Sequence, residues 1–136
     1  GVGNGPTFRS AAELGFEQFS GGDARPKVTD LIPLVSTFVG DVPCHGQLLT
    51  CCAASADSAQ ADSRRQSFPD AVAEDMEGFG VAAACTLAGV PLQIIRGISN
   101  RVGDRDHSRW EIDTALRAAA RLAVKIIPWR WIPTES

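Results

Sequence analysis

The run of small and apolar residues from Gly80 to Gly89 constrains the fold of this chain more than any other stretch. Its alanine content favours a buried helix, and its small side chains would let the helix backbone lie close to a sheet. Ala71 to Glu74 is predicted to be a short strand before this helix. Pro91 to Ser99 carries the β-branched residues of a strand after it. A strand–helix–strand order of this kind indicates a parallel sheet.

The neighbouring segments continue the same alternation. His45 to Ala53 is apolar on both faces, which is typical of a central parallel strand. Asp57 to Gln66 is predicted to be a polar helix with Asp57 or Ser58 as its N-cap. Glu77 to Ala88 is predicted to be the next helix, with Gly89 as its stop.

A last helix is expected at the carboxyl end. Ser108 to Glu111 fits an S-x-x-E capping box, and the helix is predicted to run from there to Ile127. Ser10 to Glu13 fits a second box of this type and predicts a short helical turn near the amino end. The last helix is expected to face inward with Ile112, Leu116, Ala119, Leu122 or Ala123, and Ile126.

The order β-α-β-α-β-α predicts an α/β fold, a three-layer sandwich with a mostly parallel sheet. With 136 residues the chain is expected to hold one domain at most. Residues 1–25 are expected to be a loop-rich leader and residues 26–136 the α/β portion, with a modest amphipathic helix over Pro26 to Val39. Three strands are fewer than most open sheets contain, so we expect a partial domain that lacks its N-terminal strands.

Charge and cysteine content narrow the function classes. The net charge is −3 with acidic and basic residues interleaved, so neither a nucleic-acid partner nor a membrane partner is expected. None of the four cysteines forms a C-x-x-C pair, which favours reduced thiols in a cytoplasmic protein. No cofactor or metal is expected, because Asp104, Asp106 and His107 lack a further ligand and are better explained as a loop held by backbone hydrogen bonds.

Two polar groups lie where ligands bind in open parallel sheets, at the carboxyl ends of strands. Glu77 stands at a strand-to-helix junction, and Asn100 follows the strand that ends at Ser99. From the residues alone Glu77 has two interpretations: a first-turn acid favoured by the helix dipole, or an acceptor of hydrogen bonds from sugar hydroxyls above the apolar Met76. Asn100 is either a turn-former or a planar donor–acceptor pair for a base edge.

Four segments together resemble the nucleoside phosphorylase/nucleosidase superfamily, and within it the futalosine hydrolases. The segments are Phe68 to Ala71, Glu74 to Phe79, Gly89 to Pro91, and the G-I-S-N-R-V-G-D-R-D run of Gly97 to Asp106. The D-M-E-G-F and G-I-S-N-x-x-G-D-R-D motifs are specific in combination. The resemblance extends from about His45 to Ile127 and implies the fold and chemistry of a purine nucleosidase.

The resemblance also implies site residues. Asp75, Met76 and Glu77 match the segment that holds the ribose, and Ala54 and Ser55 fall near the strand end whose backbone meets the base. Ser99 and Asn100 match the segment that contacts the leaving base, with Asn100 where adenine-specific members have Asp. Of these residues, Glu77 and Asn100 are implied to be catalytic and the others to bind substrate.

The choice of Asn favours a 6-oxopurine base. A protonated Asp can donate to purine N7 while accepting from an exocyclic amine, whereas the Asn amide offers two donors for N7 and O6. This agrees with the reaction that the resemblance implies: hydrolysis of futalosine with release of hypoxanthine, as in menaquinone biosynthesis. A 6-oxopurine phosphorylase, another purine nucleosidase, or a fragment that binds a nucleoside without catalysis are the alternatives. The expected partners are the nucleoside, the absent N-terminal portion, or a second copy in a homodimer.

Overall fold

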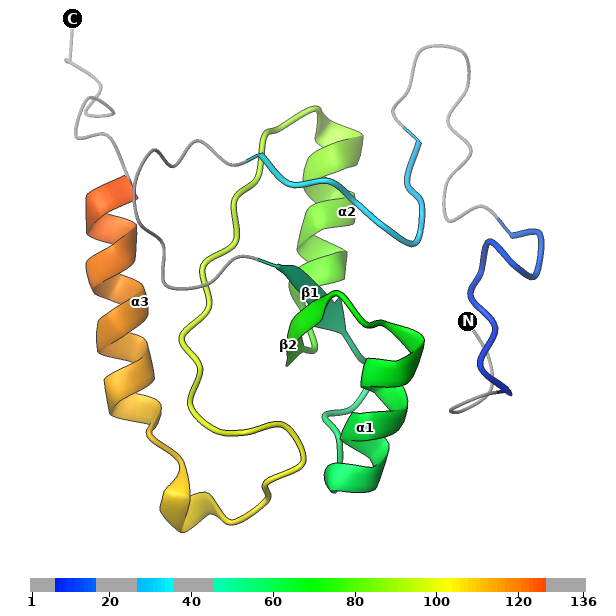
Figure 1. Ribbon diagram of the computed structural model, residues 1–136. Coiled ribbons are helices and arrows are strands. Elements are labelled where there is room, and N and C mark those ends of the chain that lie inside the picture. The colour runs from blue at the N-terminus through cyan, green and yellow to red at the C-terminus, as the bar shows by residue number, and fades with distance from the viewer. Residues whose placement is uncertain (1–6, 17–26, 36–45, 127–136) are drawn as a thin grey trace, which may run out of the picture.

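The computed structural model describes residues 7–16, 27–35 and 46–126 of the chain (Figure 1). The described part has the α/β fold expected from the sequence, with a small parallel sheet and three helices. In chain order the elements are β1 (Gln47–Thr50), α1 (Ser58–Ser67), β2 (Ala71–Asp75), α2 (Gly78–Ala88), the short 3-10 helix η2 (His107–Arg109) and α3 (Ile112–Ile126).

The two strands pair in parallel and end at the same edge of the sheet. Leu48 is paired with Ala73 and Thr50 with Asp75, and the register shifts between Gln47 and Leu48. At the carboxyl end the Thr50 hydroxyl donates to Oδ1 of Asp75 over 2.7 Å. This side-chain bond between the last residues of β1 and β2 fixes the edge at which the candidate site lies.

The helices predicted after each of the first two strands are confirmed, α1 with its N-cap and α2 with its C-terminal glycine. The Asp57 side chain accepts from the Gln60 N–H at 2.8 Å and starts α1. Gly89 ends α2 with a φ of 67°, a left-handed conformation that suits glycine at a helix C-terminus. α2 contacts β1, so the small residues of this helix do lie against the sheet.

The third strand, expected over Pro91 to Ser99, is not formed, and the sheet of the described residues has two strands. Figure 1 draws the segment as an extended trace between the strand pair and α3. Among the described residues, two backbone hydrogen bonds join this segment to other parts of the chain: the Val35 N–H donates to Leu92 O at 3.1 Å, and the Glu111 N–H donates to Ser99 O at 2.8 Å. Two isolated bonds do not make a ladder, which explains why the β-branched sequence stays extended without being a strand.

The helix α3 differs from its prediction at its start and on its buried face. It begins at Ile112, because Ser108 lies in η2 and donates its hydroxyl to Asp106 Oδ1 instead of capping α3. Ala115 is the buried residue of α3, whereas Ile112 and Leu116 are 50% and 63% exposed. The predicted stripe is therefore wrong at these two positions. The cause is a close approach of the Gly97 backbone to Ala115, which turns that side of the helix inward.

The amino-terminal segments agree with one prediction and contradict another. Ser10 and Glu13 form the predicted capping box, with Ser10 N–H donating to Glu13 Oε2 at 2.7 Å and Glu13 N–H donating to Ser10 Oγ at 3.2 Å. The helix predicted over Pro26 to Val39 is absent from residues 27–35, and its other residues lie outside the described ranges. Pro33 lacks a backbone donor, and the Val35 N–H is directed to Leu92 O instead of closing a helical turn.

Few side chains of the described residues are fully buried. Val28, Ala82 and Ala115 are the buried apolar residues, and Ser55 is the buried polar one. In the ranges that the structure describes, no helix has both the length and the apolar character needed to cross a membrane. Of the described large apolar side chains that are at least 45% exposed, eight lie on or next to α2 and α3: Met76, Val81, Leu87, Val90, Ile98, Ile112, Leu116 and Val124. Four others lie elsewhere in the described ranges, namely Phe16, Leu31, Val35 and Val72.

Candidate functional site

Asp75 organises the carboxyl end of the sheet from a buried position. Its side chain is 7% exposed. Besides accepting from Thr50, it accepts the Gly78 N–H at Oδ2 over 3.0 Å, and the Arg96 guanidinium pairs with the same oxygen. The Thr50 hydroxyl oxygen in turn accepts the Phe79 N–H at 2.8 Å. Asp75 and Thr50 therefore satisfy two of the free N–H groups at the start of α2.

Glu77 keeps its carboxylate free of capping bonds. It precedes α2 but makes no side-chain cap, because Asp75 and Thr50 already take that role. Its side chain is 65% exposed, and its contact is with the Arg96 guanidinium at 3.8 Å. Met76 beside it is 54% exposed. Glu77 therefore makes no capping hydrogen bond, although its place at the start of α2 still suits an acid favoured by the helix dipole. An acidic group next to an apolar thioether stands at the sheet edge.

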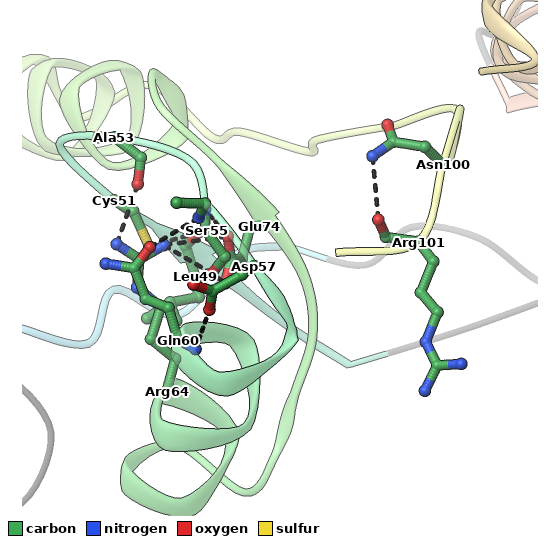
Figure 2. Close-up of polar contacts among 11 residues, drawn as sticks. Leu49, Cys51, Ala53, Ser55, Asp57, Gln60, Arg64, Glu74, Asn100 and Arg101 are labelled. Carbon is green, nitrogen blue, oxygen red and sulfur yellow. Dashed lines mark hydrogen bonds and ion pairs between the residues drawn. The ribbon is translucent and has the colours of Figure 1, made fainter. Parts of the chain in front are cut away.

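A compact polar network holds the turn that follows β1 (Figure 2). Ser55 is 1% exposed, donates its hydroxyl to Glu74 Oε1 at 2.7 Å and donates its N–H to Glu74 Oε2 at 3.1 Å. Arg64 reaches back from α1, pairs with Glu74 at 3.1 Å and donates to Ala53 O at 2.9 Å. The Ser55 side chain thus has a structural role. Ala54 lies between Ala53 and Ser55, which these hydrogen bonds hold in place.

Cysteines border the same turn. Cys51, Cys52 and Cys85 are free thiols. The Cys51 N–H donates to Asp75 O at 2.8 Å, which extends the pairing of the strands by one bond. Burial raises the pKa of the Cys51 thiol, with nearby Arg64 opposing the shift. Cys51 is consequently a poor nucleophile at neutral pH, and Cys44 lies outside the described residues.

Asn100 is engaged by its own loop. Its Oδ1 accepts the Ser99 hydroxyl at 2.8 Å, and its Nδ2 donates to Arg101 O at 3.0 Å and to Asp104 O at 3.3 Å. Figure 2 shows the amide directed at the Arg101 carbonyl. The turn-forming interpretation of Asn100 thus describes this conformation, and the longer bond to Asp104 is the one that a ligand would replace most easily.

The loop after Asn100 is held by charge pairs. Asp104 accepts from Arg109 at 2.8 Å and from the Asp106 N–H at 3.0 Å, and these two bonds lower the pKa of the Asp104 carboxyl. Asp106 also pairs with Arg109 at 3.3 Å, and the His107 ring lies 4.2 Å from that of Trp110. Within the part of the chain that the structure describes, no three His, Cys, Asp or Glu side chains form a metal-binding group.

The two loops of the candidate site touch through a glycine. Gly103 has a φ of 82°, and a Cβ built on it would lie 2.6 Å from the Asp57 carbonyl. The loop of Asn100 therefore rests on the N-cap of α1, close to the turn that carries Ala54 and Ser55. Figure 2 shows Asn100 itself apart from the network of Ser55 and Glu74. Glu77 and Met76 lie at the start of α2, directly after β2.

Sequence reasoning missed the residues that hold the site. Thr50, Arg64, Glu74 and Arg96 make the bonds that fix the two strand ends, and none was singled out for a role. Arg64 lies on a polar helix, where an arginine is usually solvated, so its sequence context gave no signal. The sequence did contain a signal for Arg96, because a charged residue within an apolar stretch usually needs a partner.

The fold and the site define a class: an α/β protein with polar groups gathered at the carboxyl ends of parallel strands. The chain belongs to the phosphorylase superfamily, whose sequence profile matches residues 8–128. It is 44% identical over 92 residues to the futalosine hydrolase of Acidothermus cellulolyticus, a match that covers 68% of this chain and 38% of that protein. The futalosine hydrolase of Streptomyces coelicolor is 41% identical over 92 residues, with coverage of 66% and 39%.

A more distant relative has a related name. The 5'-methylthioadenosine/S-adenosylhomocysteine nucleosidase of Geobacillus sp. is 34% identical over 73 residues, which are 52% of this chain and 32% of that protein. No solved structure matches the chain. The chain thus spans about two fifths of the length of these two curated relatives, the futalosine hydrolases.

Proposed function

We propose that this chain is the ribose- and base-binding part of an enzyme that hydrolyses the N-glycosidic bond of futalosine and releases hypoxanthine. The observation that carries the proposal is the exposed Glu77 carboxylate, which contacts Arg96 and stands at the sheet edge while other residues cap α2. The names of the relatives support hydrolysis of a nucleoside. Menaquinone biosynthesis in the cytoplasm is the proposed setting, and residues 1–136 are proposed to form one partial domain.

The proposed roles follow from the contacts. Glu77 accepts hydrogen bonds from the ribose hydroxyls, Met76 forms an apolar floor, and Arg96 orients Glu77. Asp75 binds no substrate directly in this arrangement, because its oxygens are taken by Thr50, Gly78 and Arg96. The C–N bond breaks before the nucleophile attacks. Water then adds to the ribosyl cation. The group that activates this water is not among the described residues.

Asn100 is proposed to read the base. When a 6-oxopurine enters, the amide gives up its bonds to Arg101 O and Asp104 O and donates its two N–H groups to N7 and O6 instead. Ser99 holds the amide orientation by its bond to Oδ1. This charge-stabilising contact to the departing hypoxanthine is the kind of interaction that lowers a transition-state barrier.

Asn100→Asp in the full-length protein is expected to shift base preference from 6-oxopurines towards 6-aminopurines by at least about tenfold, because an unpaired buried polar group is strongly penalised. Calorimetry with hypoxanthine and adenine measures the ratio of the two dissociation constants. Asp113→Asn, at an exposed position in the first turn of α3, serves as the control. If Asn100→Asp leaves the ratio unchanged, Asn100 does not read the base.

A phosphorylase of 6-oxopurine nucleosides is the second candidate, because it uses the same ribose and base contacts and the family profile carries that activity in its name. A phosphate requirement for base release separates the two activities. A protein that binds nucleosides without turnover is the third candidate, and it would leave Glu77 exposed as well.

The exposed apolar residues are proposed to be covered by a partner, either further residues of the same protein or a second copy. Val81 and Leu87 on α2 are 49% and 45% exposed, and the two-stranded sheet leaves backbone groups unpaired. We expect the isolated 136-residue chain to self-associate at micromolar concentration in sedimentation velocity experiments. A stable monomer with a cooperative unfolding transition would contradict this expectation.

A further inference from the structure

We propose that Arg64 is a positioning residue that holds the Ala54 peptide in the place where the purine base binds. The inference rests on the proposed function and adds a residue to it. Arg64 lies in α1 and is not itself a predicted substrate contact, but it donates to Ser55, which is one. Its effect on the base would therefore pass through the turn after β1. The contacts of its guanidinium with that turn carry the argument.

The guanidinium of Arg64 makes three bonds with two nitrogens. Nη2 donates to Ala53 O at 2.9 Å, and Nη1 donates both to the Ser55 hydroxyl at 3.0 Å and to Glu74 Oε2 at 3.1 Å. Figure 2 shows the side chain reaching from the helix to these acceptors. A planar fork can hold several acceptors at fixed angles, which an ammonium group cannot do. The turn is thereby tied both to α1 and to β2.

The network is sheltered and completely satisfied. The side chains of Arg64 and Glu74 are 22% and 11% exposed, and Ser55 is 1% exposed. Among the described side chains, no buried nitrogen or oxygen lacks a hydrogen-bond partner. A charge pair in such surroundings adds little net stability compared with an apolar replacement, but it fixes geometry well when all its bonds are made. Because the network lies beside the sheet edge, we infer that it keeps the geometry of the candidate site fixed.

Ala54 is the residue whose geometry is fixed. Its neighbours Ala53 and Ser55 are both anchored by Arg64, whereas the Ala54 N–H and C=O have no hydrogen bond within the described ranges. A purine edge places donors and acceptors side by side, which matches a rigid peptide that offers one of each. Turning this peptide would misplace both groups at once. We therefore expect substitution of Arg64 to weaken base binding more than it weakens the ribose contacts at Glu77.

The test uses the full-length protein with Arg64→Ala and Arg64→Lys, and Arg65→Ala as the matched control. Arg65 is the next residue of the same helix, is 74% exposed, and pairs with Asp62 only at the surface. Three quantities are measured for each variant: the dissociation constant of hypoxanthine by calorimetry, KM and kcat for nucleoside hydrolysis, and Tm. The measurements on Arg64→Ala are repeated with millimolar guanidinium, which can occupy the space of the deleted group.

We expect Arg64→Ala to weaken hypoxanthine binding and raise KM by about tenfold, the effect of losing one or two hydrogen bonds, with kcat changed less than about threefold. Guanidinium should restore much of the affinity, Arg64→Lys should show a smaller loss, and Arg65→Ala should match the wild type. If Arg64→Ala does not fold, Arg64→Lys alone must show the rise in KM.

Two results would overturn the inference. The first is a base affinity in the Arg64 variants equal to that of Arg65→Ala. The second is a parallel fall of kcat and Tm without rescue by guanidinium, which would mark a purely structural role. A wild-type protein that neither binds hypoxanthine nor cleaves a nucleoside would instead refute the proposed function, and the inference with it. Activity in the wild type separates these cases.

Discussion

Replacing Glu77 by Gln is expected to lower kcat/KM for nucleoside hydrolysis by about 100-fold, because hydrogen bonds to a charged acceptor are worth about 1.5–3 kcal/mol. The substitution keeps the shape of the side chain and removes the charge that the ribose hydroxyls would meet. Stability should change by less than about 0.5 kcal/mol, since the side chain is 65% exposed and caps no helix. Initial-rate kinetics and urea unfolding of the full-length protein measure the two effects.

Glu111→Gln is the matched control for this experiment. Glu111 also precedes a helix and is exposed; its contact with the candidate site is the backbone bond from its N–H to Ser99 O, which the side-chain substitution keeps. We expect its kinetics to match the wild type. If Glu77→Gln is strongly destabilised while its catalysis is intact, the carboxylate serves the helix and not the sugar, and the assignment of Glu77 fails.

Replacing Gly97 by Ala is expected to destabilise the protein by about 3 kcal/mol, the upper end of the usual cost of overpacking. A Cβ on Gly97 would lie 2.1 Å from Ala115 O and 2.5 Å from the Ala115 carbonyl carbon. Both contacts are with backbone atoms, so no side-chain rotation relieves them and α3 must move. The midpoint of urea unfolding should fall, and activity should fall with it, because Ser99 and Asn100 follow directly in the chain.

Gly80→Ala is expected to have the opposite effect on stability. A Cβ at Gly80, within α2, meets no atom closer than 4 Å, and alanine in a helix is favoured over glycine by about 1 kcal/mol. The unfolding midpoint should therefore rise slightly. A Gly97→Ala variant as stable as Gly80→Ala would mean that the extended segment and α3 are not in close contact.

The local signals in the sequence predicted most of the elements. Alanine content, Asp57 as a cap and Gly89 as a stop defined α1 and α2, because these signals act within a few residues. The predictions failed where tertiary contacts decided the outcome. The segment over Pro91 to Ser99 has strand-forming residues but too few backbone partners, and the buried face of α3 depends on the missing side chain of Gly97.

The sequence suggested a region for the candidate site but not the contacts that hold it. A carboxylate after β2 and an amide after the segment expected to be a third strand suggested the region, and the motifs around Glu77 and Asn100 suggested a nucleoside. The side chains that fix the site come from distant parts of the chain, such as Arg64 on Glu74, and periodicity carries no information about such pairs. The sequence likewise contained no sign that the Asp75 side chain is buried while that of Glu77, two residues later, is exposed.

The most direct test of the central claim is product analysis of the full-length protein with futalosine in phosphate-free buffer. We predict release of free hypoxanthine together with the unphosphorylated sugar product, at a rate that added phosphate does not change. The Glu77→Gln variant should release it about 100-fold more slowly at low substrate concentration. Absence of base release, or release only when phosphate is present, would contradict the assignment of this chain to a nucleoside hydrolase.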